Sequence, residues 1–297
     1  MKKLLAATLL VGLVHSAWAI TTINSTNHFS YGANIGWIEW RGDNTSGAVI
    51  GEFVCSGSIY AANVGWISLG GGTPINGIRY QNNSASDFGV NHDGNGNLQG
   101  YAYGANIGWL TFTNRDGTGA SYAGPRVDLL TGKLSGYIWS GNVGWIDLSN
   151  AQAFVRTDVV LPGPDTDGDG IADAFERLWT GNLTTMNATS DFDHDGFSDL
   201  SEYLADTNPT DATSNLRIVN YSVSFTSQEV HALTWSSRPS RLYQLQHRLN
   251  LNTNTPWVSL GANFPPSAGT STSAGIALSP INGQRYWQVI VLRPLGP

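Results

Sequence analysis

The sequence predicts a mainly β protein with three parts: an N-terminal domain of repeated β-hairpins, a short segment of acidic loops and helices, and a C-terminal β-sandwich. Three observations support this fold class. An aromatic heptapeptide occurs four times before residue 146, twelve acidic residues gather between residues 165 and 212, and alternating apolar residues follow residue 213. Glycine is abundant and Val, Thr, Tyr and Trp recur, a composition that favours strands and tight turns over helices.

Residues 1–19 have the layout of a secretory signal peptide. Lys2 and Lys3 precede an apolar run over residues 4–14, and residues 17–19 read A-W-A, the small-x-small form of a cleavage site. The run is too short for a transmembrane helix, and no second apolar span follows it. We therefore expect a secreted, extracellular or cell-surface protein whose mature chain begins at Ile20.

Cys55 is the only cysteine, so no disulfide can form within the chain, although export normally favours disulfides. We expect Cys55 to be a small buried thiol in a strand. Some other interaction must then fasten the fold.

The heptapeptide Y-G-A-N-I-G-W at residues 31–37 recurs in related form at residues 60–66, 103–109 and 139–145. Asn-(Ile/Val)-Gly fits the three-residue loop of a hairpin, a type I turn followed by a left-handed glycine. This register places Ala33 opposite Trp37 and Tyr31 diagonal to it. The apolar residues after each Trp then point to the opposite face of the sheet; they are Ile38, Ile67, Leu110 and Ile146. Stacked hairpins predict a propeller-like domain, a meander or a sandwich over residues 20–159.

Two roles are open for the repeated aromatic residues. As a repeat core, the rings would pack against neighbouring repeats, and we take the heptapeptide mainly as such a structural unit. In the alternative, the rings stack on sugar faces, because aromatic side chains with a polar tip suit such sites, and the repeat asparagines bond sugar hydroxyls. Those asparagines are Asn34, Asn63, Asn106 and Asn142. The candidate ligand-binding residues are Tyr31, Trp37, Tyr60, Trp66, Tyr103, Trp109, Trp139 and Trp145.

Two acidic loops follow a short linker at residues 160–164. Residues 165–176 read D-T-D-G-D-G-I-A-D-A-F-E, and residues 191–202 read D-F-D-H-D-G-F-S-D-L-S-E. Both match the EF-hand spacing, with acids at loop positions one, three and five, Gly at six, an apolar residue at seven, Asp at nine and Glu at twelve. Closely spaced carboxylates supply the hard oxygen ligands that Ca²⁺ prefers, whereas the tight octahedron of Mg²⁺ suits such loops less well. The pattern predicts two Ca²⁺ ions.

The segment from about Asp165 to Asp211 resembles bacterial thrombospondin type 3-like and EF-hand-like repeats and, more distantly, dockerin modules. The Glu at position twelve and the bulky F-E-R-L-W helix depart from the dockerin pattern, which argues against a cohesin partner. The resemblance implies structural Ca²⁺ at Asp165, Asp167, Asp169, Ile171, Asp173 and Glu176, and at Asp191, Asp193, Asp195, Phe197, Asp199 and Glu202. Residues 165–212 hold twelve acids and one base, so without cations this segment repels itself.

Residues 213–297 change to a strand pattern. Val219, Tyr221, Val223 and Phe225 alternate as in a half-buried strand, and five or more such strands predict a β-sandwich. The module loosely resembles the fibronectin type III-like end modules of exported bacterial proteins. Its expected core consists of Trp235, Tyr243, Trp257 and Trp287.

The sequence contains no recognisable catalytic constellation. His28, His92, His231 and His247 stand alone, and the paired carboxylates lie in the calcium loops. No basic stripe with interleaved aromatics indicates nucleic acid. We expect a non-catalytic, calcium-binding structural or adhesion protein whose partner is a cell-surface glycan or an extracellular protein. A calcium-stabilised lectin is the alternative, and a glycoside hydrolase with a pair such as Glu39 and Glu52 is a third.

Overall fold

The computed structural model describes residues 21–42, 45–114, 122–225, 227–252, 254–265, 269–281 and 284–296. The predicted signal peptide lies outside these ranges. The chain divides into two compact units, described separately below. The barrel unit contains residues 21–168, 172–183 and 295–296, and the C-terminal unit contains residues 169–171 and 184–294. Within the described ranges, no helix has both the length and the apolar character needed to cross a membrane.

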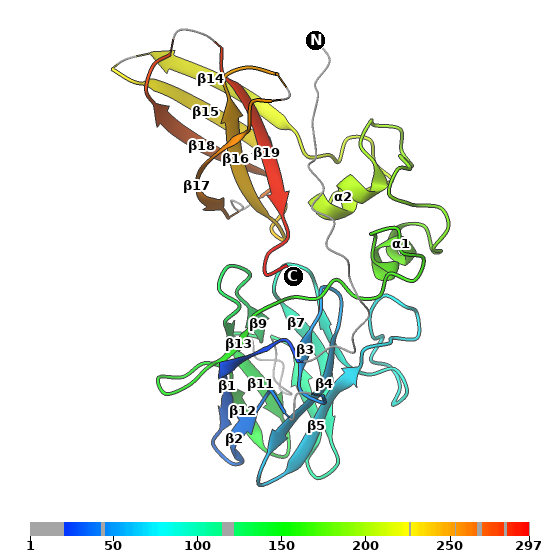
Figure 1. Cartoon of the computed structure of the whole chain (residues 1–297). Helices are drawn as coiled ribbons and strands as arrows, with labels where there is room; N and C mark the ends of the chain where they lie inside the picture. The colour runs from blue at the N-terminus through cyan, green and yellow to red at the C-terminus, as the bar shows by residue number, and fades with distance from the viewer. Residues whose placement is uncertain are drawn as a thin grey trace. The chain divides into compact units, whose positions relative to one another are not determined.

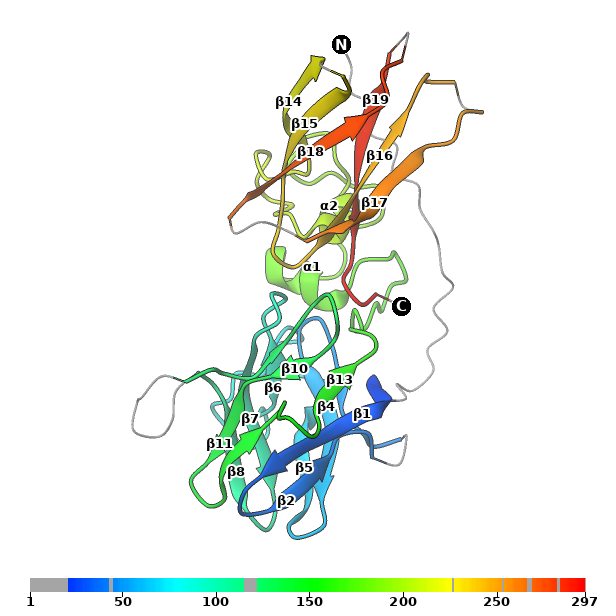
Figure 2. The ribbon, with the colours of Figure 1, turned by 90° about the vertical axis from the view of Figure 1, so that its left-hand side faces the viewer.

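Eight antiparallel strands close into a barrel in the barrel unit (Figures 1 and 2), which confirms the mainly β prediction. They follow one another around the barrel, and β12 pairs with β1 to close it. The four hairpins therefore belong to one continuous sheet. The barrel strands are β1 (Ile23–Gly32), β2 (Gly36–Glu39), β4 (Cys55–Ala61), β5 (Gly65–Gly71), β7 (Leu98–Gly104), β8 (Gly108–Phe112), β11 (Tyr137–Ser140) and β12 (Gly144–Asp147).

Short strands extend the barrel wall at the end away from the heptapeptide turns. Strand β3 (Val49–Ile50) pairs with β4, β6 (Val90–His92) with β7, and β13 (Val155–Thr157) with β1. Strands β9 (Arg126–Val127) and β10 (Leu134–Ser135) form a separate two-stranded ladder. Helix α1 (Asp173–Trp179) also belongs to the barrel unit.

Each heptapeptide forms the tip of one hairpin. The glycine before each Trp is left-handed, with φ of +79° at Gly36 and +85° at Gly65, as the turn chemistry predicts. The predicted register is wrong, however. Gly32 pairs with Gly36, and Tyr31 lies directly opposite Trp37, so Ala33 belongs to the turn. The reason is that the backbone N–H of Ile35 donates to the Gly32 carbonyl at 3.1 Å, which starts the turn one residue earlier than expected.

The repeat asparagines join the four hairpins into a ring. The side-chain amide of each asparagine donates to the backbone carbonyl of the Ile or Val in the preceding hairpin turn, at 3.0–3.1 Å. The donor–acceptor pairs are Asn34 to Val143, Asn63 to Ile35, Asn106 to Val64 and Asn142 to Ile107. The first asparagine reaches back to the last turn, so the ring closes where β12 meets β1. Each side-chain amide thus uses one N–H within the fold, and the expectation that these side chains bond sugar hydroxyls stays a prediction.

Side chains of equivalent positions fill the barrel in tiers. One fully buried tier contains Ile38, Ile67, Leu110 and Ile146, which lie, as predicted, on the sheet face opposite the repeat Trp residues. In two neighbouring tiers, large side chains are balanced by small ones. The large Trp40 accompanies the small Ser30, and the large Phe112 accompanies the small Ala102. Trp40 also donates its indole N–H to Ser30 Oγ at 2.8 Å. The interior is thus a packed core, closed at the turn end by Ile35, Ile107 and Val143.

The C-terminal unit contains helix α2 (Asp199–Ala205) and two three-stranded antiparallel sheets. One sheet has the order β14-β15-β18 and the other β17-β16-β19. Both sheets contribute to one core cluster around Leu233, Trp235, Tyr243, Leu245 and Val289. The strands are β14 (Ile218–Phe225), β15 (Glu229–Ser236), β16 (Leu242–Arg248), β17 (Val258–Phe264), β18 (Ser271–Leu278) and β19 (Tyr286–Leu292). The fibronectin III-like assignment stays a prediction.

Two details of this unit differ from the sequence prediction. Strand β14 lies at the edge of its sheet, and its Val219, Tyr221, Val223 and Phe225 are all exposed, so the strand is not half-buried. Trp235 and Tyr243 lie in the core and Trp287 packs against it, but Trp257 lies outside the cluster, under the Arg248 guanidinium at 4.4 Å.

Loss of one ring hydrogen bond tests the role of the asparagines. We expect Asn63→Ala to lower the free energy of unfolding by about 0.5–1.5 kcal/mol, the net value of one intramolecular hydrogen bond. Denaturant unfolding of the mature chain measures this loss. The control is Asn83→Ala, at an exposed asparagine outside the ring. Equal stability of both variants would show that the ring contributes nothing.

Candidate metal centre

The second acidic loop brings three carboxylates together. Asp191, Asp193 and Asp195 each offer an oxygen, and these oxygens lie within 4.8 Å of one another. The loop folds this way because its carboxylates accept backbone N–H groups: Gly196 donates to Asp191 at 2.9 Å, and Phe197 donates to Asp195 at 2.8 Å. Gly196 has a φ of +93°, which fits the predicted sharp bend at the sixth position. The entire loop and the helix after it lie in the C-terminal unit.

Glu202 supplies a buried carboxylate beside these three. It lies on α2 and is 1% exposed. Thr207 donates its hydroxyl to Oε1 at 3.1 Å, whereas Oε2 is buried with no hydrogen-bond partner. Asp193 Oδ2 is a second buried oxygen without a partner. Because unpaired buried carboxylate oxygens are costly, this pair of acceptors fits a cation that the loop would hold.

The electrostatics of the loop agree with this geometry. Burial, with a smaller contribution from the charges of Asp193, Asp195 and Asp199, raises the pKa of Glu202 to about 8 against the lowering effect of the Thr207 hydrogen bond. Burial also raises the pKa of Asp193, and Asp195 adds to this rise. A divalent cation would reverse the balance, because its positive charge favours the ionised carboxylates.

The aspartates at the ninth loop position have a different role from the rest. Asp199 is fully buried and accepts hydrogen bonds from the Ser190 hydroxyl at 2.5 Å and the Phe192 backbone at 3.0 Å. Asp173 accepts two hydrogen bonds from Thr166 in the same way. Both carboxylates therefore hold the start of their loop against its helix. A ninth-position ligand often reaches Ca²⁺ through water, so their predicted role as ligands stays a prediction.

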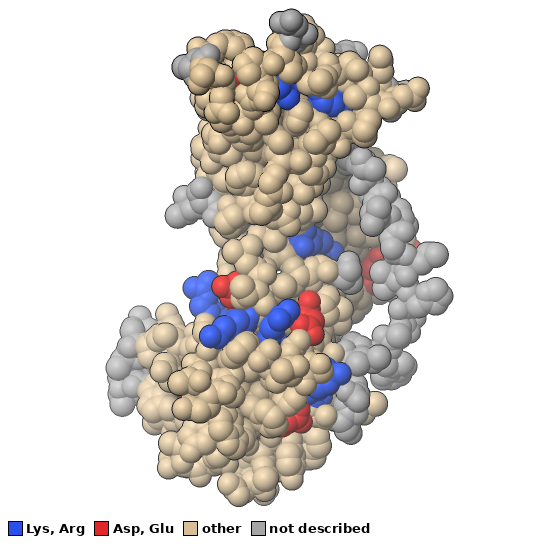
Figure 3. Space-filling model, turned by 60° about the vertical axis from the view of Figure 1, so that its left-hand side comes forward, with Lys and Arg blue, Asp and Glu red and all other residues tan. Residues whose placement is uncertain are grey.

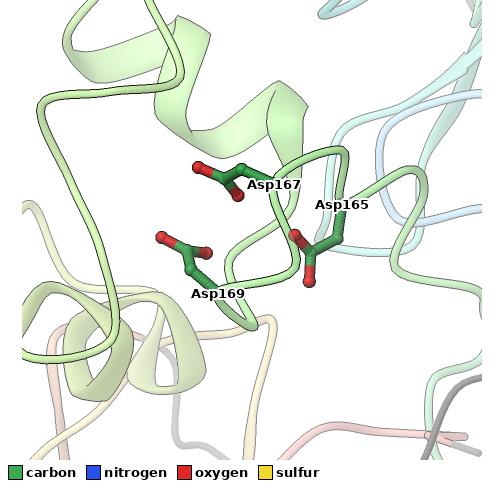
Figure 4. Close-up of side chains that lie close together, drawn as sticks. All are labelled: Asp165, Asp167 and Asp169. Atoms are coloured by element: carbon green, nitrogen blue, oxygen red, sulfur yellow. The ribbon is translucent and has the colours of Figure 1, made fainter.

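The first acidic loop repeats the arrangement. The carboxylates of Asp165, Asp167 and Asp169 project from one turn of the chain toward one another (Figure 4), and their oxygens also lie within 4.8 Å. Ile171 donates its backbone N–H to Asp169 at 2.8 Å, as Phe197 does to Asp195 in the second loop. Glu176, at the twelfth position, is fully buried on α1. The backbone carbonyls of Ile171 and Phe197 stay predicted ligands.

No protein-family model matches this chain, and no curated protein or solved structure matches it either.

The repeat aromatics lie on the outer wall of the barrel, so their predicted role as repeat core is wrong. Trp37, Trp66, Trp109 and Trp145 are 39–48% exposed, and Trp139 is half-buried. The reason is the pleat of the strands: the interior takes the neighbouring Ile or Leu, so the Trp must point outward. Each Trp packs on the aromatic residue directly opposite, with ring centroids 4.6–5.0 Å apart. The pairs are Tyr31–Trp37, Tyr60–Trp66, Tyr103–Trp109 and Trp139–Trp145.

Other residues singled out in the sequence have structural roles. Cys55 is buried in β4, as predicted, and burial raises the pKa of its thiol to about 12. His92 is buried between the Gly51 carbonyl and the Gly96 N–H, at 2.9 and 3.1 Å from its two ring nitrogens. Glu39 accepts backbone N–H groups from Arg41 and Gly42, both at 2.9 Å.

His231 and His247 do not stand alone, contrary to expectation. Both rings contact Trp287, and Arg285 connects them: it donates to His247 Nδ1 at 3.0 Å and pairs with Glu229 at 3.1 Å. Glu229 in turn lies 3.4 Å from His231 Nε2. The one sequence signal for this cluster is that Glu229 is the single acid among six bases after residue 212.

The raised pKa of Glu202 predicts how the metal-free protein responds to pH. The folded-state pKa of about 8 lies above the usual 4.5, so the folded state holds this proton more tightly than the unfolded state. The contribution of Glu202 to stability is therefore greatest below pH 4.5 and is lost as the pH rises through 8. We expect denaturant unfolding in chelator to show this fall, and Glu202→Gln to show a flatter dependence. The same slope in both proteins would contradict the assignment.

Proposed function

We propose that this protein is an exported, calcium-binding, non-catalytic protein with a structural or adhesive role. The observation that carries the proposal is the second acidic loop, where three converging carboxylates adjoin the buried and partly unpaired Glu202. Asp191, Asp193, Asp195 and Glu202 would hold the ion as oxygen ligands, and the first loop would hold a second Ca²⁺. The ions supply positive charge to a segment that carries twelve acids and one base.

The second loop is tied to the sheets of its unit, which gives calcium a structural effect beyond the loop. Asn215 donates its side-chain amide N–H to the Asp195 carboxylate at 2.8 Å, and its backbone carbonyl accepts the Ser236 hydroxyl of β15 at 2.7 Å. The guanidinium of the buried Arg241 donates to the carbonyls of Leu204 and Tyr203 at the end of α2, at 2.8 and 3.0 Å. An ion held by Glu202 would therefore fix α2 against the chain that enters β16.

Removal of calcium tests this proposal. We expect chelator to lower the melting temperature of the two acidic loops and of the sheets tied to the second loop, while the eight strands of the barrel unfold as before, because metal binding contributes to the folding free energy of the part that binds it. Hydrogen exchange separates the two units. Glu202→Gln is expected to weaken Ca²⁺ binding by tenfold or more, a loss of about 1.4 kcal/mol, in isothermal titration.

The matched control for that titration is Asp211→Asn, an exposed acid outside the four proposed ligands of the second loop. A melting temperature that is the same in calcium and in chelator would contradict the proposal.

A second candidate function is carbohydrate binding in the manner of a lectin. A specific observation favours it: the repeat Tyr and Trp rings are exposed in sequence around the barrel wall instead of being buried. Exposed pairs of large aromatic rings with a polar tip are typical of surfaces that bind a ligand. In this case the calcium loops stabilise the chain and the barrel wall carries the ligand.

A further inference from the structure

We propose that the barrel wall carries four equivalent stations for sugar rings and that together they bind a neutral, pyranose-containing polysaccharide. Each station consists of the two paired aromatic rings of one hairpin and one polar side chain of the preceding hairpin. The inference rests on the second candidate function, carbohydrate binding, and names its ligand class and valency.

The strand register defines the stations. Each first aromatic of a hairpin lies opposite its own Trp on one side and opposite a polar residue of the preceding hairpin on the other. Residues directly opposite each other on neighbouring strands share one face of the sheet. The stations are Asp147–Tyr31–Trp37, Glu39–Tyr60–Trp66, Ser68–Tyr103–Trp109 and Thr111–Trp139–Trp145. In such a station the aromatic rings can stack on the apolar face of a sugar while the neighbouring polar oxygen accepts a hydrogen bond from one of its hydroxyls.

Backbone N–H groups hold the polar residues of three stations in place. Each oxygen of Glu39 accepts one backbone N–H, Asp147 Oδ1 accepts the Ser149 N–H at 2.9 Å, and Ser68 Oγ accepts the Gly70 N–H at 3.2 Å. A carboxylate oxygen has a second lone pair, so each keeps the capacity to accept a hydroxyl. These acceptors are therefore oriented before a ligand arrives, which lowers the entropy cost of binding.

The charge of the wall selects a neutral ligand. Each of the eight barrel strands has two outward-facing positions near its hairpin turn, and these positions form two rows around the barrel. Of the sixteen side chains in the two rows, eleven are aromatic, two are acidic and none is basic. On the face shown in Figure 3, uncharged side chains make up the end of the barrel with the hairpin turns. Uronic acids, sulfated sugars and phosphate groups would meet Glu39 and Asp147 without a cation in either row to pair with.

The layout fits a sugar chain better than a second protein. Polar residues interrupt the aromatics at every hairpin boundary, and the wall of a closed barrel is convex, so the surface offers small separate platforms. A stable protein interface instead needs about 800 Å² of continuous surface on each partner. A polysaccharide can follow the wall and place successive sugars on several stations. One station would bind weakly, and four on one ligand gain affinity through effective concentration.

The test is retention of the mature full-length chain on insoluble polysaccharides. The neutral probes are cellulose, chitin, xylan and mannan, and the anionic probes are pectate and alginate. We expect retention on at least one neutral probe, accompanied by a change in Trp fluorescence. Trp37→Ala is expected to weaken retention about three- to tenfold, and replacement of Trp37, Trp66, Trp109 and Trp145 together by about a hundredfold or more. Trp37→Phe, which keeps a ring, is expected to retain most of the binding.

The control is Trp179→Ala, which removes an exposed indole of α1 outside the stations and is expected to leave retention unchanged. Thermal unfolding checks each variant, and the four single variants stand in for the quadruple variant if that chain does not fold. No retention on any neutral probe, equal retention on the anionic probes, or retention that the Trp variants do not alter would overturn the inference. The inference would also be overturned if sedimentation showed a dimer that the Trp variants dissociate, because the aromatic wall would then be a protein interface. Calcium titration of the same samples shows separately whether the protein binds Ca²⁺, so a lack of sugar binding is not confused with a lack of calcium binding.

Discussion

The hydrogen bond from each repeat asparagine to the turn of the preceding hairpin is the interaction on which the barrel depends. Four such bonds of 3.0–3.1 Å form a closed ring and require each hairpin to sit in one register against the last. That register sends Ile or Leu inward and Tyr or Trp outward at every repeat. One heptapeptide thus serves two purposes, since its asparagine fastens the fold and its aromatic residues remain available at the surface.

The acidic segment is held together by different forces from those in the barrel. The barrel is fastened by neutral hydrogen bonds and a tightly packed interior, whereas the acidic loops concentrate like charges that only a cation can balance. Asn215 and Arg241 connect the second loop to the sheets beside it, so an ion there would act on a whole unit. A chain with one buried cysteine would in this way replace disulfides with an asparagine ring in the barrel and calcium in the acidic segment.

Sequence reasoning reached the local features and missed those that depend on closure. The left-handed Gly36 and the clustering of Asp191, Asp193 and Asp195 follow from turn chemistry and ligand spacing. The outward position of Trp37 does not, because alternation along a strand gives two faces without saying which one becomes the interior of a barrel. The ring contact from Asn34 to Val143 joins residues 109 positions apart, and no local pattern encodes it.

In the barrel the asparagines of the repeat bind neighbouring turns, and we propose that its indoles bind a ligand. Side-chain amide and indole N–H resonances, followed by NMR while a soluble neutral oligosaccharide is added, test this division most directly. The account predicts that the amides of Asn34, Asn63, Asn106 and Asn142 are protected from exchange and stay in place, while the indole signals of Trp37, Trp66, Trp109 and Trp145 shift. Rapidly exchanging asparagine amides that shift with the sugar, beside indoles that do not respond, would contradict it.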